Sequence, residues 1–371
     1  MIVGVPKEIK DNEYRAGLVP TSVLELTHHN HEVLVQSGLG AGIGMTDDDY
    51  RAAGAQIVET ASEVFEKAEL IVKVKEPQPQ EISMLKKGQV LFAYLHLAPD
   101  LAQTEGLMKS GVTAIAYETI FTPDGVLPLL APMSEVAGRL AVQAGASCLE
   151  KDNGGAGILL GGVPGVDSAH VLIIGGGIVG ENAAYIAKGM GAQVTILDKN
   201  VPRLRELDNN FAGRVHCVFS NKASIEKYAL EADLVIGAVL VAGAAAPRLL
   251  SRDLISRMKP GSVVVDVAID QDGCFETSRP TTHSDPTFVV DDVVHYCVAN
   301  MPGVVPRTSS FGLNNATLPY ILLLADEGWQ QALADDEGFM AGLNVHAGHL
   351  CCKAVAEAHG LNYSEPEQFL I

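Results

Sequence analysis

The stretch from His170 to Asp198 constrains the fold of this chain more than any other part of the sequence. An apolar run, Val171–Ile174, predicts a buried parallel strand, and a G-x-G-x-x-G turn follows it. A helix is expected from Ile178 to Met190, and a second strand, Val194–Leu197, ends in an acidic residue. Strand, glycine turn, helix, strand and acid follow one another in the order of a dinucleotide-binding unit.

The three glycines of this turn each have a physical role. Gly175 allows a tight turn, Gly177 lets the backbone approach a pyrophosphate, and Gly180 lets the helix pack on the strand. The helix N-terminus adds free N–H groups and a partial positive charge for the phosphates. Asp198 can accept hydrogen bonds from a ribose 2′-hydroxyl. Because all parts stand where a Rossmann domain needs them, we expect bound NAD rather than a purely structural glycine turn.

Composition excludes several classes of function. With 371 residues, the chain is more typical of two domains than of one. The formal charge of −19 argues against nucleic acid or a membrane surface as a partner, and no apolar run reaches about 18 residues. The sequence starts on the strand-like Ile2–Val5, without a signal-peptide core, and its six cysteines form no C-x-x-C pair. We therefore expect a cytoplasmic protein with reduced thiols.

The first 128 residues show a second alternation of strands and helices. Helices are expected at Ser22–Thr27 and Ala61–Lys67, between apolar runs, which favours a parallel sheet. The expected strands are Ile2–Val5, Glu32–Val35, Leu70–Val74, Val90–Tyr94 and Thr113–Tyr117.

After a helix from Ser134 to about Lys151, a glycine-rich connector leads into the dinucleotide-binding half. Beyond Pro306, we expect helices over 315–334 and 339–359 and no strands, so this tail must pack on the N-terminal domain. The further strands expected in the dinucleotide-binding half are Val215–Val218, Leu234–Ala238, Ser262–Val267 and Val293–Val298.

The predicted fold class is therefore α/β, with two doubly wound parallel-sheet domains and an active site in the cleft between them. A discontinuous substrate domain comprises residues 1–128 and 307–371, and a Rossmann domain comprises residues 129–306.

Four polar residues lie at or beyond the carboxyl ends of expected strands, where open sheets bind ligands. They are Arg15, Lys75, His96 and Asp270. The fork of an arginine suits a carboxylate, Lys or His can polarise a carbonyl, and His or Asp can move a proton. Taken singly, each also fits a structural role, since strand-end lysines are usually solvated and lone histidines are usually structural.

Two histidine clusters have simpler interpretations. His28, His29 and His31 fit a polar turn before a strand. His346 and His349 would share one helical face near Cys351, but a zinc site needs further ligands in a fixed geometry. We expect no metal site.

Along its full length the sequence resembles the bacterial L-alanine dehydrogenase family. Two departures are the residues around Arg15, where relatives usually have Asn before it and Val-Ala after it in place of Tyr14 and Ala16-Gly17, and Arg203, where Lys is more frequent. The blocks that carry the resemblance are Gly4–Ile9 with Arg15, Val72–Pro77, Tyr94–His96, Ala116–Thr119, Pro128–Arg139, Gly161–Gly165, Asp266–Thr277, His295–Gly303 and Val305–Thr308.

The resemblance implies roles for particular residues. Arg15 would bind the substrate carboxylate, Lys75 its carbonyl or amino group, and His96 and Asp270 would be the catalytic acid/base pair. A homohexamer is also implied. The implied NAD contacts, together with the glycine turn, are Ser134, Gly175, Gly177, Ile178, Val179, Gly180, Asp198, Arg203, Ser220, Val239, Leu240, Val267, Ala268, Ile269, Asp270, Val298, Ala299, Asn300 and Met301.

The implied reaction is the reversible, NAD-dependent oxidative deamination of L-alanine to pyruvate and ammonium. Two alternatives remain open. The related NAD(H)-binding subunit of proton-translocating transhydrogenase has no amino-acid substrate, and a dehydrogenase of another small amino acid, such as serine or glycine, would need only a different pocket. The His96 motif and the Asp270 block favour a dehydrogenase over the transhydrogenase subunit.

Overall fold

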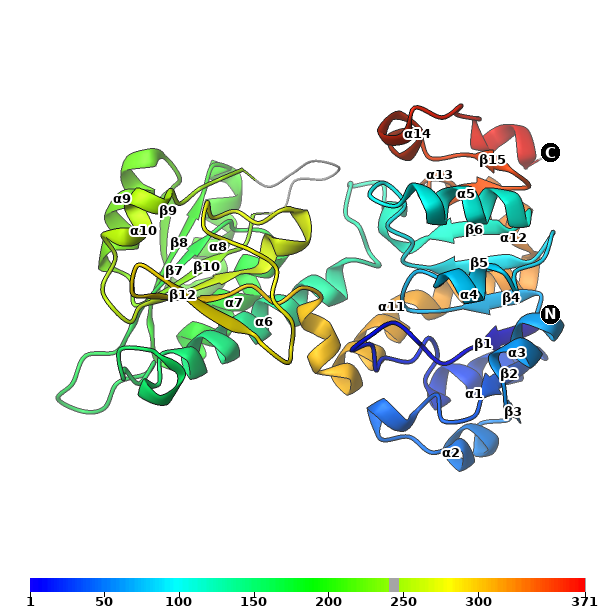
Figure 1. The fold of residues 1–371 in the computed structure, drawn as a ribbon, viewed down its shortest axis with the longest axis horizontal. Helices are drawn as coiled ribbons and strands as arrows, with labels where there is room; N and C mark the ends of the chain where they lie inside the picture. Colours follow the sequence, from blue (N-terminus) through cyan, green and yellow to red (C-terminus); the bar gives the residue numbers. More distant parts are fainter. Residues whose placement is uncertain (240–246, 371) are drawn as a thin grey trace. The chain divides into compact units, whose positions relative to one another are not determined.

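The computed structural model of the protein describes residues 1–239 and 247–370. The chain forms two compact units (Figure 1). Unit 1 comprises Met1–Met133 and Gly303–Ile371, and unit 2 comprises Ser134–Pro302. Each unit has its own mostly parallel sheet with flanking helices, which confirms the predicted α/β class.

Unit 1 contains an eight-stranded sheet in the order β15-β14-β6-β5-β4-β1-β2-β3. Strands β1 to β6 are parallel, and the order reverses between β1 and β4, which is where open sheets bind ligands. The strands are β1 (Ile2–Val5), β2 (Glu32–Gln36), β3 (Gln56–Val58), β4 (Leu70–Val72), β5 (Val90–Ala93), β6 (Thr113–Ala116), β14 (Leu343–His346) and β15 (His349–Leu350).

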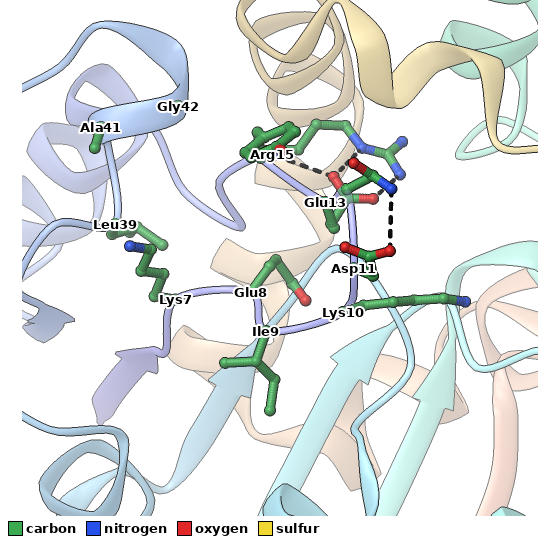
Figure 2. A pocket seen from close by; sticks show the side chains of 12 residues that line it. Lys7, Glu8, Ile9, Lys10, Asp11, Glu13, Arg15, Leu39, Ala41 and Gly42 are labelled. Atoms are coloured by element: carbon green, nitrogen blue, oxygen red, sulfur yellow. Dashed lines mark hydrogen bonds and ion pairs between the residues drawn. The ribbon is translucent and has the colours of Figure 1, made fainter. Parts of the chain in front are cut away.

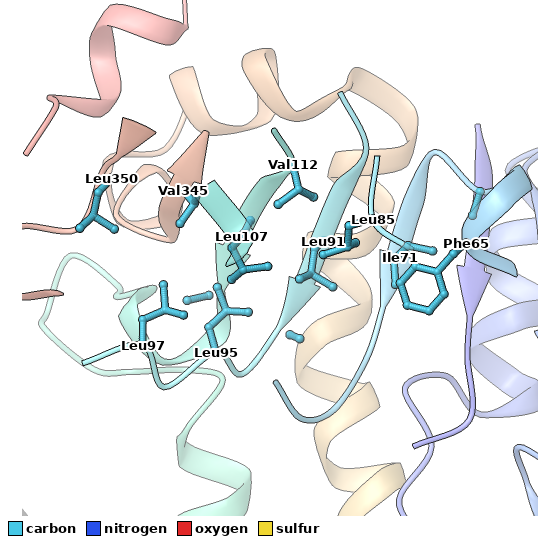
Figure 3. Packing of buried hydrophobic residues seen from close by; sticks show 14 of the residues in the cluster. Phe65, Ile71, Leu85, Leu91, Leu95, Leu97, Leu107, Val112, Val345 and Leu350 are labelled. Atoms are coloured by element: carbon cyan, nitrogen blue, oxygen red, sulfur yellow. The ribbon is translucent and has the colours of Figure 1, made fainter. Parts of the chain in front are cut away.

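Helices cover both faces of this sheet. On one face, Ile71 and Leu91 pack with Phe65 and Leu107 from two helices (Figure 3). On the other face, the Phe92 ring lies 6.1 Å from the Phe339 ring between centroids. The helices are α1 (Pro20–His28), η1 (Ala41–Ile43), α2 (Asp47–Ala52), α3 (Ala61–Lys67), α4 (Pro79–Ile82), α5 (Leu101–Ser110), η2 (Tyr117–Thr119), α11 (Pro306–Glu327), α12 (Trp329–Ala334), α13 (Glu337–Met340), α14 (Lys353–His359) and η6 (Pro366–Phe369).

The prediction of a helical tail without strands was wrong. Residues 343–350 form a hairpin, β14 and β15, whose turn places Ala347 and Gly348 in the left-handed region. Strand β14 pairs antiparallel with β6, so the sheet is mixed rather than purely parallel. His346 and His349 therefore face each other across the hairpin instead of sharing a helical face. Short apolar runs such as this one do not distinguish a strand from a buried helix.

Unit 2 contains a seven-stranded sheet in the order β12-β13-β11-β10-β7-β8-β9. All neighbouring strands are parallel except β12 and β13, so this sheet is also mixed. The order reverses between β7 and β10, which puts the glycine turn after β7 at the switch point of a Rossmann sheet. The strands are β7 (His170–Ile174), β8 (Gln193–Asp198), β9 (His216–Phe219), β10 (Leu234–Gly237), β11 (Val263–Asp266), β12 (Thr287–Val290) and β13 (Val293–Tyr296).

One core of unit 2 joins Leu172, Val235 and Val264 of neighbouring strands to Ile225 and Ile255 of two helices. Within the described residues, no helix combines the length and the apolar character needed to cross a membrane. The helices are α6 (Ala131–Cys148), which begins in unit 1, η3 (Lys151–Asn153), α7 (Ile178–Gly189), α8 (Val201–Phe211), α9 (Lys222–Glu231), α10 (Arg252–Ser256), η4 (Val267–Gln271) and η5 (Met301–Val304).

Candidate active site

The glycine turn after β7 has the geometry that a bound dinucleotide requires. Gly175 has φ of 109°, a conformation that other residues rarely adopt. A Cβ on Gly180 would lie 1.8 Å from the carbonyl oxygen of Gly175, so only glycine allows this packing of α7 on the turn. A Cβ on Gly177 would meet no atom within 4 Å, which leaves its backbone open to approach by a pyrophosphate.

Asp198 joins the glycine turn to the end of β8. Its Oδ2 accepts the N–H of Gly176 at 2.7 Å, and its Oδ1 accepts the N–H of Asn200 at 2.7 Å. Its carbonyl oxygen accepts the N–H of the buried Ser220 at 2.8 Å. Since each carboxylate oxygen can accept more than one hydrogen bond, Asp198 retains acceptor capacity for a ribose hydroxyl.

The turn that carries Asp270 is organised by a residue that the sequence analysis did not single out. The carboxylate of the fully buried Asp266 accepts the N–H of Ala268 at 3.1 Å, the N–H of Cys274 at 2.9 Å and the hydroxyl of Ser278 at 2.5 Å. These bonds fix η4, which contains Asp270. The Asp270 Oδ2 then accepts the N–H of Asn300 at 3.4 Å, so two predicted cofactor-binding segments meet here.

The remaining predicted cofactor contacts are distributed over unit 2. Ser134 lies in α6, and Ile178 and Val179 begin α7. Val239 follows β10, whereas Leu240 lies outside the described residues. Val298 and Met301 are buried, and Ala299 lies in the loop between them. Within the part of the chain that the structure describes, no group of three His, Cys, Asp or Glu side chains could hold a metal ion.

In unit 1, Arg15 lies in the loop after β1, where that loop lines a cavity of about 350 Å³ (Figure 2). Its side chain is buried, and its Nε and Nη2 donate to the two carboxylate oxygens of Glu13 at 2.7 and 2.5 Å. Burial lowers the pKa of the guanidinium, but the hydrogen bonds and charge of Glu13 raise it above its ordinary value. Arg15 is therefore a fixed, permanently charged anchor.

Lys75 follows β4 and is positioned by a buried ionic cluster. Lys73, with no solvent exposure, lies 2.8 Å from Glu8 Oε2 and 2.9 Å from Glu81 Oε1. The other oxygen of Glu8 accepts the backbone N–H of Val74 at 2.7 Å and that of Lys75 at 3.3 Å. Burial raises the pKa of Glu8, although the charge of Lys73 opposes this. The cluster thus fixes the backbone of Lys75.

His96 follows β5 in a strained conformation that its neighbours stabilise. Its φ of 49° lies in the left-handed region, and its backbone N–H donates to Glu118 Oε1 at 2.6 Å. The same oxygen accepts the N–H of Leu95 at 3.1 Å. The imidazole stacks on the buried Tyr94 ring, with centroids 5.9 Å apart, and the Tyr94 hydroxyl donates to the carbonyl of Leu129 at 2.5 Å. Backbone and ring of His96 are therefore both held.

The structure brings three predicted residues to the same edge of unit 1. Arg15, Lys75 and His96 follow β1, β4 and β5, which are adjacent in the sheet. Glu118 and Tyr94 were not assigned a role by the sequence analysis, although both lie in blocks that carry the family resemblance. Both residues could have been identified from those blocks if the strand order had been known.

Comparisons with known proteins match both units of the chain. The model of the alanine dehydrogenase/PNT N-terminal domain matches residues 4–137, and that of the C-terminal domain matches residues 141–353. An alanine dehydrogenase from Halomonas elongata is 61% identical, with 98% of each chain covered. An alanine dehydrogenase from Mycolicibacterium smegmatis is 55% identical over the full length of both chains.

Two solved structures share the fold. An L-alanine dehydrogenase superposes with a TM-score of 0.95 at 52% identity, covering 97% of this chain and 99% of the other. A transhydrogenase from Sinorhizobium meliloti superposes with a TM-score of 0.81 at 26% identity, covering 95% of this chain and 100% of the other.

Proposed function

This chain belongs to the alanine dehydrogenase/PNT family, and from that premise we propose that it catalyses the reversible oxidative deamination of L-alanine to pyruvate and ammonium with NAD. The observation that carries the proposal is its full-length identity of 55–61% to proteins named alanine dehydrogenase. The transhydrogenase shares only 26% sequence identity with this chain, which favours an alanine dehydrogenase over a subunit that presents NAD(H) to a partner.

The residues of unit 1 have the chemistry that this substrate needs. The buried guanidinium of Arg15 suits the carboxylate shared by alanine and pyruvate, because that charge persists throughout the reaction. The ammonium of Lys75 suits the carbonyl oxygen of pyruvate. His96 of unit 1 and Asp270 of unit 2 are our candidates for the proton transfers that accompany addition and loss of water and ammonia. Bound NAD supplies the hydride acceptor, and the chain supplies binding, orientation and proton transfer.

Glu118 is a further candidate for supporting catalysis, as a positioning residue. In Glu118→Gln, the hydrogen bonds to the backbone of residues 95 and 96 lose their charge assistance, worth about 1 kcal/mol. We expect kcat for pyruvate amination to fall roughly fivefold, with little change in KM. Glu63→Gln is a matched control, since Glu63 likewise accepts a backbone N–H, that of Thr60 at 3.0 Å. An equal loss of kcat in both variants would contradict the positioning role.

The family implies a dinucleotide cofactor, and the acid at the end of β8 favours NAD over NADP. A 2′-phosphate would face the Asp198 carboxylate and would displace the ribose hydroxyl from it. Losing a charge-assisted hydrogen bond of about 1.5–3 kcal/mol predicts at least a tenfold preference for NADH in kcat/KM. Steady-state assays with both cofactors check this, and equal kcat/KM values would refute it.

The substrate is tested by a panel of L-alanine, L-serine and glycine, with reduction of NAD followed by absorbance. We expect the highest kcat/KM with L-alanine. A higher kcat/KM with serine or glycine would make that amino acid the preferred substrate. A protein that binds NAD but reduces none with any amino acid would support the transhydrogenase-type alternative. A cytoplasmic location, expected from the sequence composition, and a homohexamer, implied by the family resemblance, remain predictions.

A further inference from the structure

Each of the three guanidinium nitrogens of Arg203, in the first turn of α8, has a partner. Its Nε donates to the carbonyl oxygen of Gly176 at 2.7 Å, and its Nη1 lies 2.6 Å from a carboxylate oxygen of Glu206. Its Nη2 forms an ion pair with Glu181, in the first turn of α7. Glu181 is itself held by Asn210, whose side-chain amide donates to its other oxygen at 3.0 Å.

This arginine lies where Rossmann domains distinguish their cofactors. Arg203 bonds the carbonyl and Asp198 bonds the N–H of the same residue, Gly176, so both side chains flank the glycine turn. In Rossmann domains an acid at this strand end binds the ribose 2′-hydroxyl, whereas a nearby arginine accommodates a 2′-phosphate. The chain thus carries both an acid that suits NAD and a cation that suits NADP.

The charges around Arg203 decide between these two possibilities. One guanidinium is paired with two carboxylates, and the Asp198 carboxylate lies on the other side of Gly176. The cluster formed by this guanidinium and the three carboxylates therefore has a net negative charge. A 2′-phosphate that approached it would have to displace a carboxylate from Arg203 before it could form a charge-assisted bond of its own.

We propose that Glu181 and Glu206 are specificity-determining residues, which hold Arg203 as a brace of the glycine turn and so withhold it from a 2′-phosphate. The proposal rests on the NAD-dependent function proposed above and adds to it the residues that exclude NADP. Asp198 alone would repel the phosphate, but a mobile Arg203 would offset that repulsion. The two glutamates prevent this by occupying the donors that a phosphate would use.

The test is the affinity of the full-length Glu181→Gln/Glu206→Gln variant for NAD⁺ and NADP⁺, measured by titration calorimetry without substrate. We expect the ratio of Kd(NADP⁺) to Kd(NAD⁺) to fall about tenfold, since a charge-assisted bond to phosphate replaces a repulsion. Glu226→Gln is the matched control, because Glu226 pairs with Arg257 at 2.8 Å on the same unit, outside the glycine turn. In the control, the ratio should not change.

A third substitution separates release of Arg203 from the simple loss of negative charge. Adding Arg203→Gln to the double variant should restore the wild-type ratio. An unchanged ratio in the double variant would overturn the proposal. A lowered ratio that persists in the triple variant would overturn it as well. Equal weakening of both cofactors would also overturn it, since the network would then only support the turn. If the wild-type protein binds neither NAD⁺ nor adenosine 5′-monophosphate, the proposed function itself fails as well.

Discussion

Replacing His96 or Asp270 should lower kcat for pyruvate amination by roughly 10²–10⁴-fold, the usual contribution of a general acid or base. His96→Asn is preferable to an alanine substitution because asparagine tolerates the left-handed conformation that residue 96 adopts, with φ of 49°. Asp270→Asn keeps an oxygen that can accept the N–H of Asn300 but cannot take up a proton at neutral pH. His96→Asn should retain wild-type affinity for NADH, because His96 is not among the implied NAD contacts.

The control for this experiment is His28→Asn, at the exposed C-terminal end of α1. It should retain wild-type kcat. Stopped-flow measurement of kcat and a calorimetric Kd for NADH separate a loss of chemistry from a loss of binding. Wild-type kcat in both the His96 and the Asp270 variants would show that the catalytic groups lie elsewhere.

Arg15→Ala should raise KM for pyruvate strongly and change kcat much less. The carboxylate of the substrate keeps its charge throughout the reaction, so Arg15 stabilises the ground state and the transition state alike. Removing one partner of a buried charge pair costs about 2–5 kcal/mol, which corresponds to roughly a 30- to 5,000-fold rise in KM. The substitution also leaves the buried Glu13 without its bidentate partner, so thermal stability must be measured in parallel.

Arg51→Ala is the control for Arg15, since Arg51 forms an exposed ion pair with Asp48 and should be nearly neutral. Arg15→Lys keeps the charge but loses the fork, so it should recover only part of the affinity. A kcat that falls as far as kcat/KM, with KM unchanged, would contradict the binding role and assign Arg15 to the transition state.

The dinucleotide-binding half was predictable because its signals are local. The apolar run of β7, the spacing of Gly175 and Gly180, and the acid at the end of β8 are adjacent in sequence, and each is required by backbone geometry. The prediction for the C-terminal tail failed for the opposite reason. Leu343–His346 becomes a strand because β6 offers it an unpaired edge, and nothing within those residues specifies that partner.

The supporting residues of the candidate site were missed because their partners are distant in the sequence. Glu118 holds the backbone of His96, and Glu8 holds that of Lys75, across separations of 22 and 67 residues. Asp266 gathers donors from the turn that follows its own strand, at separations of up to 12 residues. A carboxylate that accepts hydrogen bonds from backbone N–H groups leaves no periodic pattern in the sequence. The strand order must therefore be known before such a residue can be given a role.

The most direct test of the proposed function follows the hydride itself. The purified protein is incubated with NAD⁺ and L-alanine deuterated at Cα, and the reduced cofactor is analysed by mass spectrometry. We predict that deuterium appears in the reduced nicotinamide and that pyruvate accumulates in equal amount. Reduction of NAD⁺ without transfer of deuterium, or no reduction at all by a protein that binds NAD⁺, would contradict the account.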